Sequence, residues 1–271
     1  MIDNQTTIVC SMAIKQGKLG AAMHNAAYAH LGLNYAYVPM TVTDLRGAIA
    51  GMRAFNFRGS AVSMPYKQPV MRYMDKIDPV AREIGAVNTI SNKGGSLVGY
   101  NSDWIGAVAA LKEAGPLKGM RAVLLGAGGA ARAISYGLVK GGAEVTIFNR
   151  TPAKARLLAR KFGLEFGGTI SAAGACGDYD ILINATPVGF YPETGISPLA
   201  AEDIRPGKIV MDVVFNPPHT PFMENARRRG CTVVPGYRML IHQALFQFEE
   251  FTGRKAPFAV MERALRRALR G

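Results

Sequence analysis

The sequence predicts an α/β protein with two domains, each built around a mostly parallel β-sheet. Short apolar runs alternate with helical patterns along residues 8–104, and such an alternation implies parallel strands joined by crossover helices. Hydrophobic residues make up 49% of the 271 residues and charged residues only 19%, a composition typical of a well-buried globular protein and not of a disordered chain. A chain of this length is long enough for two ordinary domains.

The elements of the first half follow from the spacing of apolar residues. Continuous apolar runs indicate strands, whereas apolar residues three and four positions apart indicate helices. The pattern predicts strands at residues 7–12, 35–40 and 59–64, and helices at 21–31, 45–55 and 104–114. Gly115 and Pro116 end the last of these helices, because proline cannot continue the hydrogen-bond ladder.

The second half opens on a new strand and ends in a helical tail. Strands are predicted at residues 121–125, 145–148, 180–184 and 209–214, and the tail from 237 to 271 has a helical pattern. We therefore expect one domain over residues 105–236. The other is expected to combine residues 1–104 with residues 237–271, whose helices return to it.

A glycine-rich turn joins the strand at 121–125 to an alanine-rich helical pattern. Gly126, Gly128 and Gly129, followed by Ala131, match a dinucleotide-binding turn whose last glycine is replaced by another small residue. Glycine lets the backbone approach a pyrophosphate at a helix N-terminus. Such a turn alone is weak evidence, since ordinary tight turns look similar. The strand before it, the helix after it and the basic residues downstream favour a Rossmann-type domain.

The end of the strand at 145–148 indicates which dinucleotide is bound. NAD-binding domains normally place a carboxylate there, on the ribose 2′-hydroxyl. Here Asn149 and Arg150 occupy the position, and Lys154 and Arg156 follow on the next turn. A carboxylate would repel a 2′-phosphate, whereas guanidinium and ammonium groups attract it. The sequence therefore favours NADP over NAD.

The formal net charge of +13 admits two interpretations. One is nucleic-acid binding. However, the basic residues concentrate on helical faces, without the interleaved aromatic residues that stack on bases. Solvated helix faces that attract anionic small molecules are the simpler interpretation. We expect no nucleic-acid partner.

Membrane spans, targeting segments and metal sites are not indicated. No apolar run approaches the roughly eighteen residues that a membrane span needs, and residues 1–5 lack the features of a signal peptide. Cys10, Cys176 and Cys231 are widely spaced, odd in number and without metal-like neighbours. We interpret them as reduced core residues of a cytoplasmic protein that uses neither a metal nor a membrane partner.

Three polar side chains of the first half follow apolar runs, where open α/β sheets bind their ligands. They are Lys67, Asn88 and Asp103. Reduction of a ketone by hydride needs a proton donor at the oxygen, and an ammonium held beside a carboxylate can supply it. Each residue also has a structural interpretation. Lys67 and Asn88 suit surface turns, and Asp103 suits the N-cap of the helix that follows it.

Taken together, several segments resemble the shikimate dehydrogenase family. The resemblance extends over essentially the whole chain, and its motifs occur in register. The matching segments are residues 23–27 (MHNAA), 65–67 (PYK), 85–89 (GAVNT), 101–106 (NSDWIG), 126–130 (GAGGA), 149–151 (NRT), 184–189 (NATPVG), 212–217 (DVVFNP), and Gly236 through Met239 and Leu240 to Gln243.

The resemblance implies an NADP-dependent interconversion of 3-dehydroshikimate and shikimate or a closely related cyclic hydroxy acid, a step of aromatic amino acid biosynthesis in the chorismate pathway. It implies a proton relay of Lys67 and Asp103, with Asn88 and Gln243 on the substrate hydroxyls. The cofactor contacts that it implies are Gly126, Ala127, Gly128, Gly129, Ala130, Asn149, Arg150, Thr151, Lys154, Thr186, Val214 and Gly236.

The chain departs from the family where the substrate carboxylate binds. The family usually has Ser-x-Ser-Pro before the His-Asn pair, and both hydroxyls hold the carboxylate. Residues 18–21 of this chain read KLGA, so Lys18 offers only a flexible point charge. Ser63 keeps a hydroxyl, Tyr66 replaces a histidine and Phe215 replaces a tyrosine. Lys18, Ser63 and Phe215 are therefore substrate-binding positions of altered chemistry, and the preferred substrate is open.

Three functions follow from these observations. The first is a shikimate dehydrogenase-like enzyme, and the second is a relative that acts on quinate or an amino-substituted ring. The third is an NADP-binding protein with little turnover, which the retained Lys67 and Asp103 disfavour, because a pure binder needs no proton donor. The partner expected in each case is a small molecule, and a monomer and a homodimer are equally compatible with the sequence.

Overall fold

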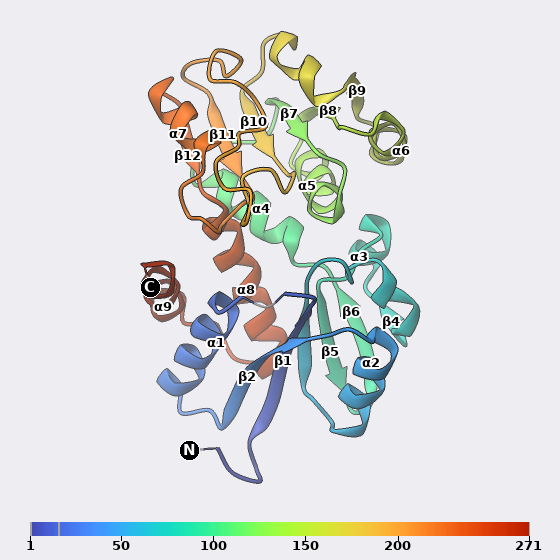
Figure 1. The fold of residues 1–271 in the computed structure, drawn as a ribbon. Coiled ribbons are helices and arrows are strands. Elements are labelled where there is room, and N and C mark those ends of the chain that lie inside the picture. Colours follow the sequence, from blue (N-terminus) through green and yellow to red (C-terminus); the bar gives the residue numbers. More distant parts are fainter. Residues whose placement is uncertain (1, 16, 271) are drawn as a thin grey trace. The chain divides into compact units, whose positions relative to one another are not determined.

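The computed structural model describes residues 2–15 and 17–270, so Met1, Gln16 and Gly271 lie outside it although the predicted domains include them. The chain forms two compact units, Met1–Ser102 with Gln243–Gly271, and Asp103–His242 (Figure 1). The second boundary falls inside the helix at Gly236–Thr252 and not at its start, because a continuous helix passes from one unit to the other.

The first unit is built on a six-stranded sheet in the order β2-β1-β3-β5-β6-β4. Strands β1, β2 and β3 are parallel, as predicted, and β1 lies between the other two. The elements are β1 (Thr7–Ala13), α1 (Leu19–His30), β2 (Tyr35–Thr41), α2 (Leu45–Ala54), β3 (Gly59–Val62), η1 (Pro69–Tyr73), β4 (Lys76–Ile77), α3 (Pro79–Ile84), β5 (Thr89–Lys93), β6 (Ser96–Tyr100), α8 (Gly236–Thr252) and α9 (Phe258–Arg270).

An antiparallel hairpin extends this sheet beyond the predicted strands. β5 pairs antiparallel with both β3 and β6, and Gly94 and Gly95 form its turn with φ of 62° and 90°. Two successive positive φ angles are the requirement of the tight hairpin turns that match strand twist. The adjacent Gly94 and Gly95 are therefore a sequence feature typical of a hairpin turn. This hairpin brings residue 88 to the carboxyl end of β3.

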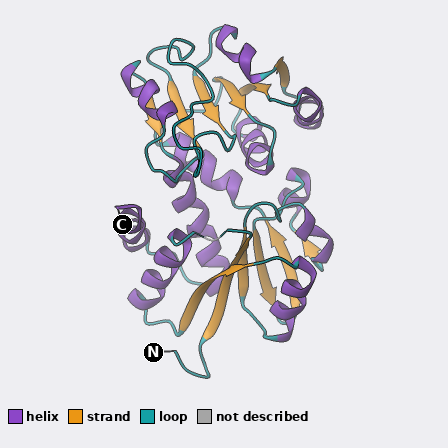
Figure 2. Ribbon diagram, in the orientation of Figure 1, coloured by secondary structure: helices purple, strands orange, loops and turns teal. Residues whose placement is uncertain are grey.

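Helices cover both faces of the first sheet (Figure 2). One face packs on α2 through a core that includes Ile49, Met52 and Ile90. On the other face Phe251 of α8 approaches Gly59 so closely that a Cβ there would lie 2.4 Å from the ring. α9 packs along α1, so the C-terminal helices do return to the first unit.

The second unit is a six-stranded, fully parallel sheet in the order β12-β11-β10-β7-β8-β9. The strand order reverses between β7 and β10, and buried clusters line both faces, which confirms the predicted Rossmann-type domain. The elements are α4 (Asp103–Lys112), β7 (Arg121–Leu125), α5 (Gly129–Lys140), β8 (Glu144–Phe148), α6 (Pro152–Phe162), β9 (Glu165–Gly168), η2 (Ile170–Ala175), β10 (Ile181–Asn184), β11 (Ile209–Asp212), α7 (Pro221–Arg228) and β12 (Thr232–Val234).

No helix in the described part of the chain is long and apolar enough to cross a membrane.

His24 is a titratable group inside the core of the first unit. Its ring is fully buried on α1 and stacks on Tyr37 with centroids 4.6 Å apart. Within the described structure neither ring nitrogen has a hydrogen bond. Burial lowers the pKa of the imidazole to about 3, an effect that the nearby Gln247 side chain partly offsets. The folded protein therefore holds this histidine neutral.

His24 should make the protein sensitive to acid. In the unfolded chain the His24 imidazole takes up a proton near pH 6.5. In the folded chain it stays neutral down to about pH 3. The contribution of His24 to the free energy of unfolding is therefore complete above pH 6.5 and decreases as the pH falls below that value. Between pH 6.5 and 5 the loss should reach about 2 kcal/mol. Urea unfolding at both pH values should show a smaller difference for His24→Phe. Equal pH dependence of variant and wild type would contradict the assignment.

Candidate active site

The glycine turn after β7 has the backbone geometry of a phosphate cradle. Gly126 has φ of 109°, and its N–H donates to the Phe148 carbonyl at 2.7 Å. A Cβ at this position would lie 2.8 Å from the Ala185 carbonyl oxygen. Gly128 is the N-cap of α5, and no side chain caps this helix end. A Cβ added at Gly128 would have no neighbouring heavy atom within 4 Å among the described residues. The first N–H groups of α5 are therefore available to an anion.

The end of β8 has the basic character that the sequence indicated. The Asn149 amide donates to the Thr151 carbonyl at 2.9 Å and shapes the turn into α6. Arg150, Thr151 and Lys154 are exposed. α6 has neither a side-chain cap nor an acidic residue in its first turn. These residues fit a 2′-phosphate, because they combine free donors with positive charge and present no carboxylate in this turn.

A buried polar network joins the ends of β10 and β11. Asp212 accepts hydrogen bonds from the Asn184 amide at 2.9 Å, from the Val214 N–H at 3.0 Å and from the Thr220 hydroxyl at 2.6 Å. The Asn184 oxygen accepts from the Thr186 hydroxyl at 2.6 Å. Burial raises the pKa of the Asp212 carboxyl to about 6, and these hydrogen bonds oppose the rise. Thr186 and Val214, both predicted cofactor contacts, lie in this network.

In the first unit Asn88 lies at the centre of a second buried network. Its amide nitrogen donates to the Ser102 hydroxyl at 3.0 Å and to the Gln243 carbonyl oxygen at 3.3 Å. Its oxygen accepts from the Thr89 hydroxyl at 2.8 Å and from the Ser102 N–H at 2.7 Å. The structure thus brings together Asn88 and Gln243, two predicted substrate contacts that are far apart in the sequence. α8 carries Gln243 to this place.

Lys67 and Asp103 are each tied to the residues around Asn88. The Lys67 carbonyl accepts from the Val87 N–H at 2.7 Å, and its side chain is half-buried. Asp103 is 1% exposed and begins α4, directly after Ser102. Both proposed catalytic residues are therefore adjacent, through the backbone, to the network of Asn88.

The remaining predicted substrate positions lie in loops or at helix ends. Ser63 is exposed after β3, and the Tyr66 hydroxyl donates to the Val42 carbonyl at 2.6 Å, so Tyr66 has a structural hydrogen bond. Lys18 is exposed and precedes α1. Phe215 is half-buried and meets Phe190 edge-on at 5.9 Å. None of the three predicted positions, Lys18, Ser63 and Phe215, offers a buried donor for a carboxylate.

Tyr37 occupies the space beside Gly20. A Cβ at residue 20 would lie 3.2 Å from the Tyr37 hydroxyl oxygen and 3.5 Å from the ring carbon that bears it. Contacts of 3.2 Å are tighter than those of most real side chains. A serine at position 20 therefore requires this tyrosine to move by a few tenths of an ångström.

Sequence reasoning missed several members of these networks. Gln247 donates to the Thr89 hydroxyl at 3.1 Å and lies one helical turn after Gln243. Residues four apart share a helix face, so this spacing was a usable signal. Asp212 and Thr220 are eight residues apart in a segment without regular periodicity, and no local pattern linked them. Among the described residues, no group of three or more His, Cys, Asp or Glu side chains is placed to hold a metal ion.

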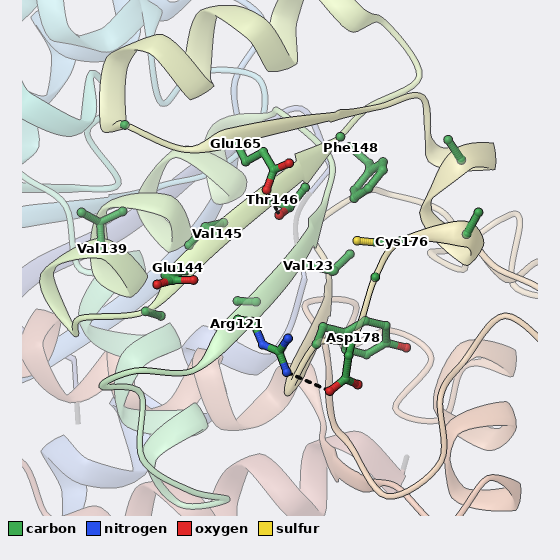
Figure 3. Close-up of a pocket in the computed structure, with 18 residues that line it drawn as sticks. Arg121, Val123, Val139, Glu144, Val145, Thr146, Phe148, Glu165, Cys176 and Asp178 are labelled. Carbon is green, nitrogen blue, oxygen red and sulfur yellow. Dashed lines mark hydrogen bonds and ion pairs between the residues drawn. The ribbon is translucent and has the colours of Figure 1, made fainter.

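A separate hollow of about 710 Å³ opens in the second unit (Figure 3). It is lined by parts of β7, β8 and β9 and by the segment that precedes β10, and Arg121 pairs with Asp178 there at 2.8 Å. The described residues that line it include none of the predicted site residues, so it is distinct from the glycine turn.

Family models match most of the chain. Residues 12–90 match the shikimate dehydrogenase substrate binding domain, residues 108–188 match shikimate / quinate 5-dehydrogenase, and residues 236–266 match the shikimate 5'-dehydrogenase C-terminal domain. Two curated relatives are the shikimate dehydrogenases (NADP(+)) of Methanothermobacter thermautotrophicus and Moorella thermoacetica. The chain is 42% identical to each, over 99% of this chain and 99% of the first relative, and over 94% of this chain and 90% of the second.

Solved structures agree with this similarity. A shikimate dehydrogenase in complex with NADP+ has a TM-score of 0.93 and 36% identity, with 99% of this chain and 98% of that chain covered. The Thermus thermophilus shikimate 5-dehydrogenase with NADP(H) and shikimate has a TM-score of 0.88 and 36% identity, over 98% and 100%. The 5-ketofructose reductase of Gluconobacter sp. has a TM-score of 0.85 and 33% identity, over 98% and 99%.

A substitution by alanine should be tolerated much less well at Gly126 than at Gly128. Gly126→Ala places a Cβ against the Ala185 carbonyl at a positive φ, which should cost about 1–3 kcal/mol of stability. Gly128→Ala meets open space at a φ of −84° and is the matched control, with little loss of stability. Thermal unfolding of both variants without cofactor measures this difference. An equal fall in the unfolding temperature of the two variants would contradict the geometry.

Proposed function

The chain belongs to the shikimate dehydrogenase family, and we propose that it interconverts 3-dehydroshikimate and shikimate, or a closely related cyclic hydroxy acid, with NADP as the hydride carrier. The observation that carries this proposal is the combination, in one chain, of a phosphate turn with a basic end of β8 and a buried Asn88 network flanked by Lys67 and Asp103. Curated relatives over nearly the full length are named for this reaction with NADP(+).

The second unit supplies the cofactor site in this proposal. The N–H groups at the start of α5 bind the pyrophosphate, and Gly126 through Ala130 leave room for it. Asn149, Arg150, Thr151 and Lys154 hold the 2′-phosphate. Thr186, Val214 and Gly236 border the rest of the molecule. NADPH, when bound, supplies the hydride that reduces the substrate ketone.

Lys67 supplies the proton in this proposal. When the ketone carbon gains hydride, its oxygen gains negative charge and must be protonated. The Lys67 ammonium donates that proton and recovers it in the reverse reaction, while the Asp103 carboxylate orients the ammonium and stabilises its charged form. Asn88 and Gln243 hold the ring hydroxyls. Their mutual hydrogen bond of 3.3 Å must open to admit a substrate hydroxyl between them.

The carboxylate-binding part of the site is where this chain differs. Gly20 has no side chain, Lys18 is exposed, and the Tyr37 hydroxyl fills the space beside Gly20. These observations favour a second candidate substrate class, a ring or sugar ketone that needs no pair of serine hydroxyls. A related structure is named for a reductase of 5-ketofructose, a neutral sugar, and another for quinate dehydrogenase. An amino-substituted ring and an NADP-binding role with little turnover are the further alternatives.

Assays of shikimate and quinate oxidation with NADP and with NAD, and of 5-ketofructose reduction with NADPH and with NADH, test the proposal. Activity on shikimate with clear preference for NADP is the expected result. Activity confined to another of these substrates would keep the reaction type but change the substrate. NADPH binding without turnover of any substrate in the panel would favour the binding protein.

Lys67→Ala should lower kcat about a hundredfold or more, since it removes the proton donor. Binding of NADPH should stay nearly unchanged, because no proposed cofactor contact is altered. Asp103→Asn should lower kcat by the same route. Lys76→Ala, which removes an exposed lysine of the same unit, is the control. Near-normal kcat in Lys67→Ala would mean that the proton comes from elsewhere.

Restoring the serine pair should improve shikimate binding once space is made for it. Lys18→Ser with Gly20→Ser adds two hydroxyl–carboxylate hydrogen bonds, each worth about 1.5–3 kcal/mol, so KM for shikimate should fall at least about tenfold with less change in kcat. Tyr37→Phe provides the space and, alone, is the control. Improvement in the Tyr37→Phe background and not in the Tyr37 background would identify that hydroxyl as the obstacle. Failure in both would show that the pocket is shaped for another molecule.

A further inference from the structure

Asp212 is a fully buried carboxylate that the proposed proton relay does not use. It ends β11 and is 0% exposed. A carboxylate in the interior is unfavourable unless hydrogen bonds satisfy it, and three donors reach this one, from Asn184, Val214 and Thr220. A well-packed apolar residue would often give equal or greater stability at such a site. The three donors therefore indicate a role in geometry and not mainly in stability.

One oxygen of Asp212 fixes the backbone of Val214. The Val214 N–H donates to Oδ1 at 3.0 Å. On the other side of this residue, a Cβ at Gly236 would lie 2.5 Å from the Val214 carbonyl oxygen, so that only glycine permits this approach. The backbone of Val214 is thus held from both sides.

The same oxygen sets the orientation of the Asn184 amide. Its amide nitrogen donates to Asp212 Oδ1 at 2.9 Å, and a carboxylate can only accept. The amide oxygen must then face the other way, where it accepts from the Thr186 N–H at 3.0 Å and from the Thr186 hydroxyl at 2.6 Å. The Thr186 hydroxyl in turn accepts from the Val188 N–H at 3.2 Å. Asp212 therefore helps to hold Thr186 in position through Asn184, whose amide nitrogen also donates to the Val188 carbonyl at 3.3 Å.

The loops after β10 and β11 are further joined to each other and to the phosphate turn. The Tyr191 N–H donates to the Asn216 carbonyl at 3.2 Å, and Phe190 packs edge-on against Phe215. A Cβ on Gly126 would lie 3.1 Å from the Thr186 methyl group. The two loops thus border the glycine turn at the point where the strand order reverses, which is where such sheets bind dinucleotides.

We propose that Asp212 is a positioning residue for the cofactor, which holds Val214 and Thr186 in the arrangement that binds NADP. This inference rests on the proposed function, in which those two residues border the cofactor. Hydrogen bonds to Oδ1 reach Val214 directly and Thr186 through Asn184. Oδ2 accepts from the Thr220 hydroxyl and from no other group in the described part of the chain, and this hydroxyl caps α7 by accepting from the Met223 N–H. The two oxygens of one carboxylate therefore have separable effects.

Three variants separate positioning from stability. Asp212→Leu removes every acceptor and should raise the Kd for NADPH at least about tenfold, a loss of about 1.4 kcal/mol. Asp212→Asn can keep an oxygen toward Asn184 and Val214, while the Thr220 hydroxyl turns to accept, so its Kd should stay within about threefold. Thr220→Val is the matched control, and it should lower the unfolding temperature with little change in Kd. NADPH fluorescence titration and thermal unfolding without cofactor give both quantities.

A fourth variant covers the case in which Asp212→Leu does not fold. Asn184→Ala removes the connection to Thr186 together with the bond from the Asn184 amide to the Val188 carbonyl at 3.3 Å, and it leaves two donors on the carboxylate. It should also raise the Kd for NADPH. An unchanged Kd in the folded variants, with only a lower unfolding temperature, would overturn the inference and leave Asp212 a purely structural residue. Absence of NADPH binding by the wild-type chain would overturn the proposed function, and this inference with it.

Discussion

A polar group buried at the end of a β-strand must find all its hydrogen-bond partners inside the protein, and both units of this chain are organised by that requirement. In the first unit the group is Asn88, whose amide bonds Ser102, Thr89 and Gln243. In the second it is Asp212. Each group connects segments that are distant in the sequence. The loops that carry the proposed site residues therefore have few alternative arrangements, because any other would leave a buried donor or acceptor without a partner.

Glycine provides the complementary constraint at the same places. Gly126 and Gly236 each allow one backbone segment to approach a carbonyl oxygen at a distance that excludes a side chain. Hydrogen bonds hold the loops in position, and glycines provide the space in which the loops meet. Where no such close approach is needed, as at Gly128, the absence of a side chain serves the ligand instead, since it keeps the first turn of α5 open to a phosphate.

The residues proposed to bind the substrate match the family only in part. The machinery proposed for proton transfer, Lys67 and Asp103, matches the family, whereas the segment expected to hold a carboxylate does not. Because a carboxylate remote from the reacting carbon contributes mainly uniform binding, a chain can lose that contact and keep its chemistry. Such a loss would weaken the binding of a carboxylate substrate more than it would change the reaction type. In this chain the Tyr37 hydroxyl oxygen lies 3.2 Å from the position of a Cβ at residue 20, so a serine there would require a small shift of the tyrosine.

The sequence by itself determined the fold class, the strands β1, β2, β3 and β7, and the glycine turn, because these depend on local periodicity and on backbone angles that few residues adopt. It also identified Lys67, Asn88 and Asp103 as candidates, since polar residues directly after apolar runs stand out. Only the tertiary structure decided that Gln243 bonds Asn88, that Asp212 links Asn184 to Val214, and that Tyr37 reaches Gly20. Those contacts join elements far apart in the chain, and the side chains involved carry no local pattern. Their partners follow from strand order and helix placement, which hydrophobic burial sets across the whole fold.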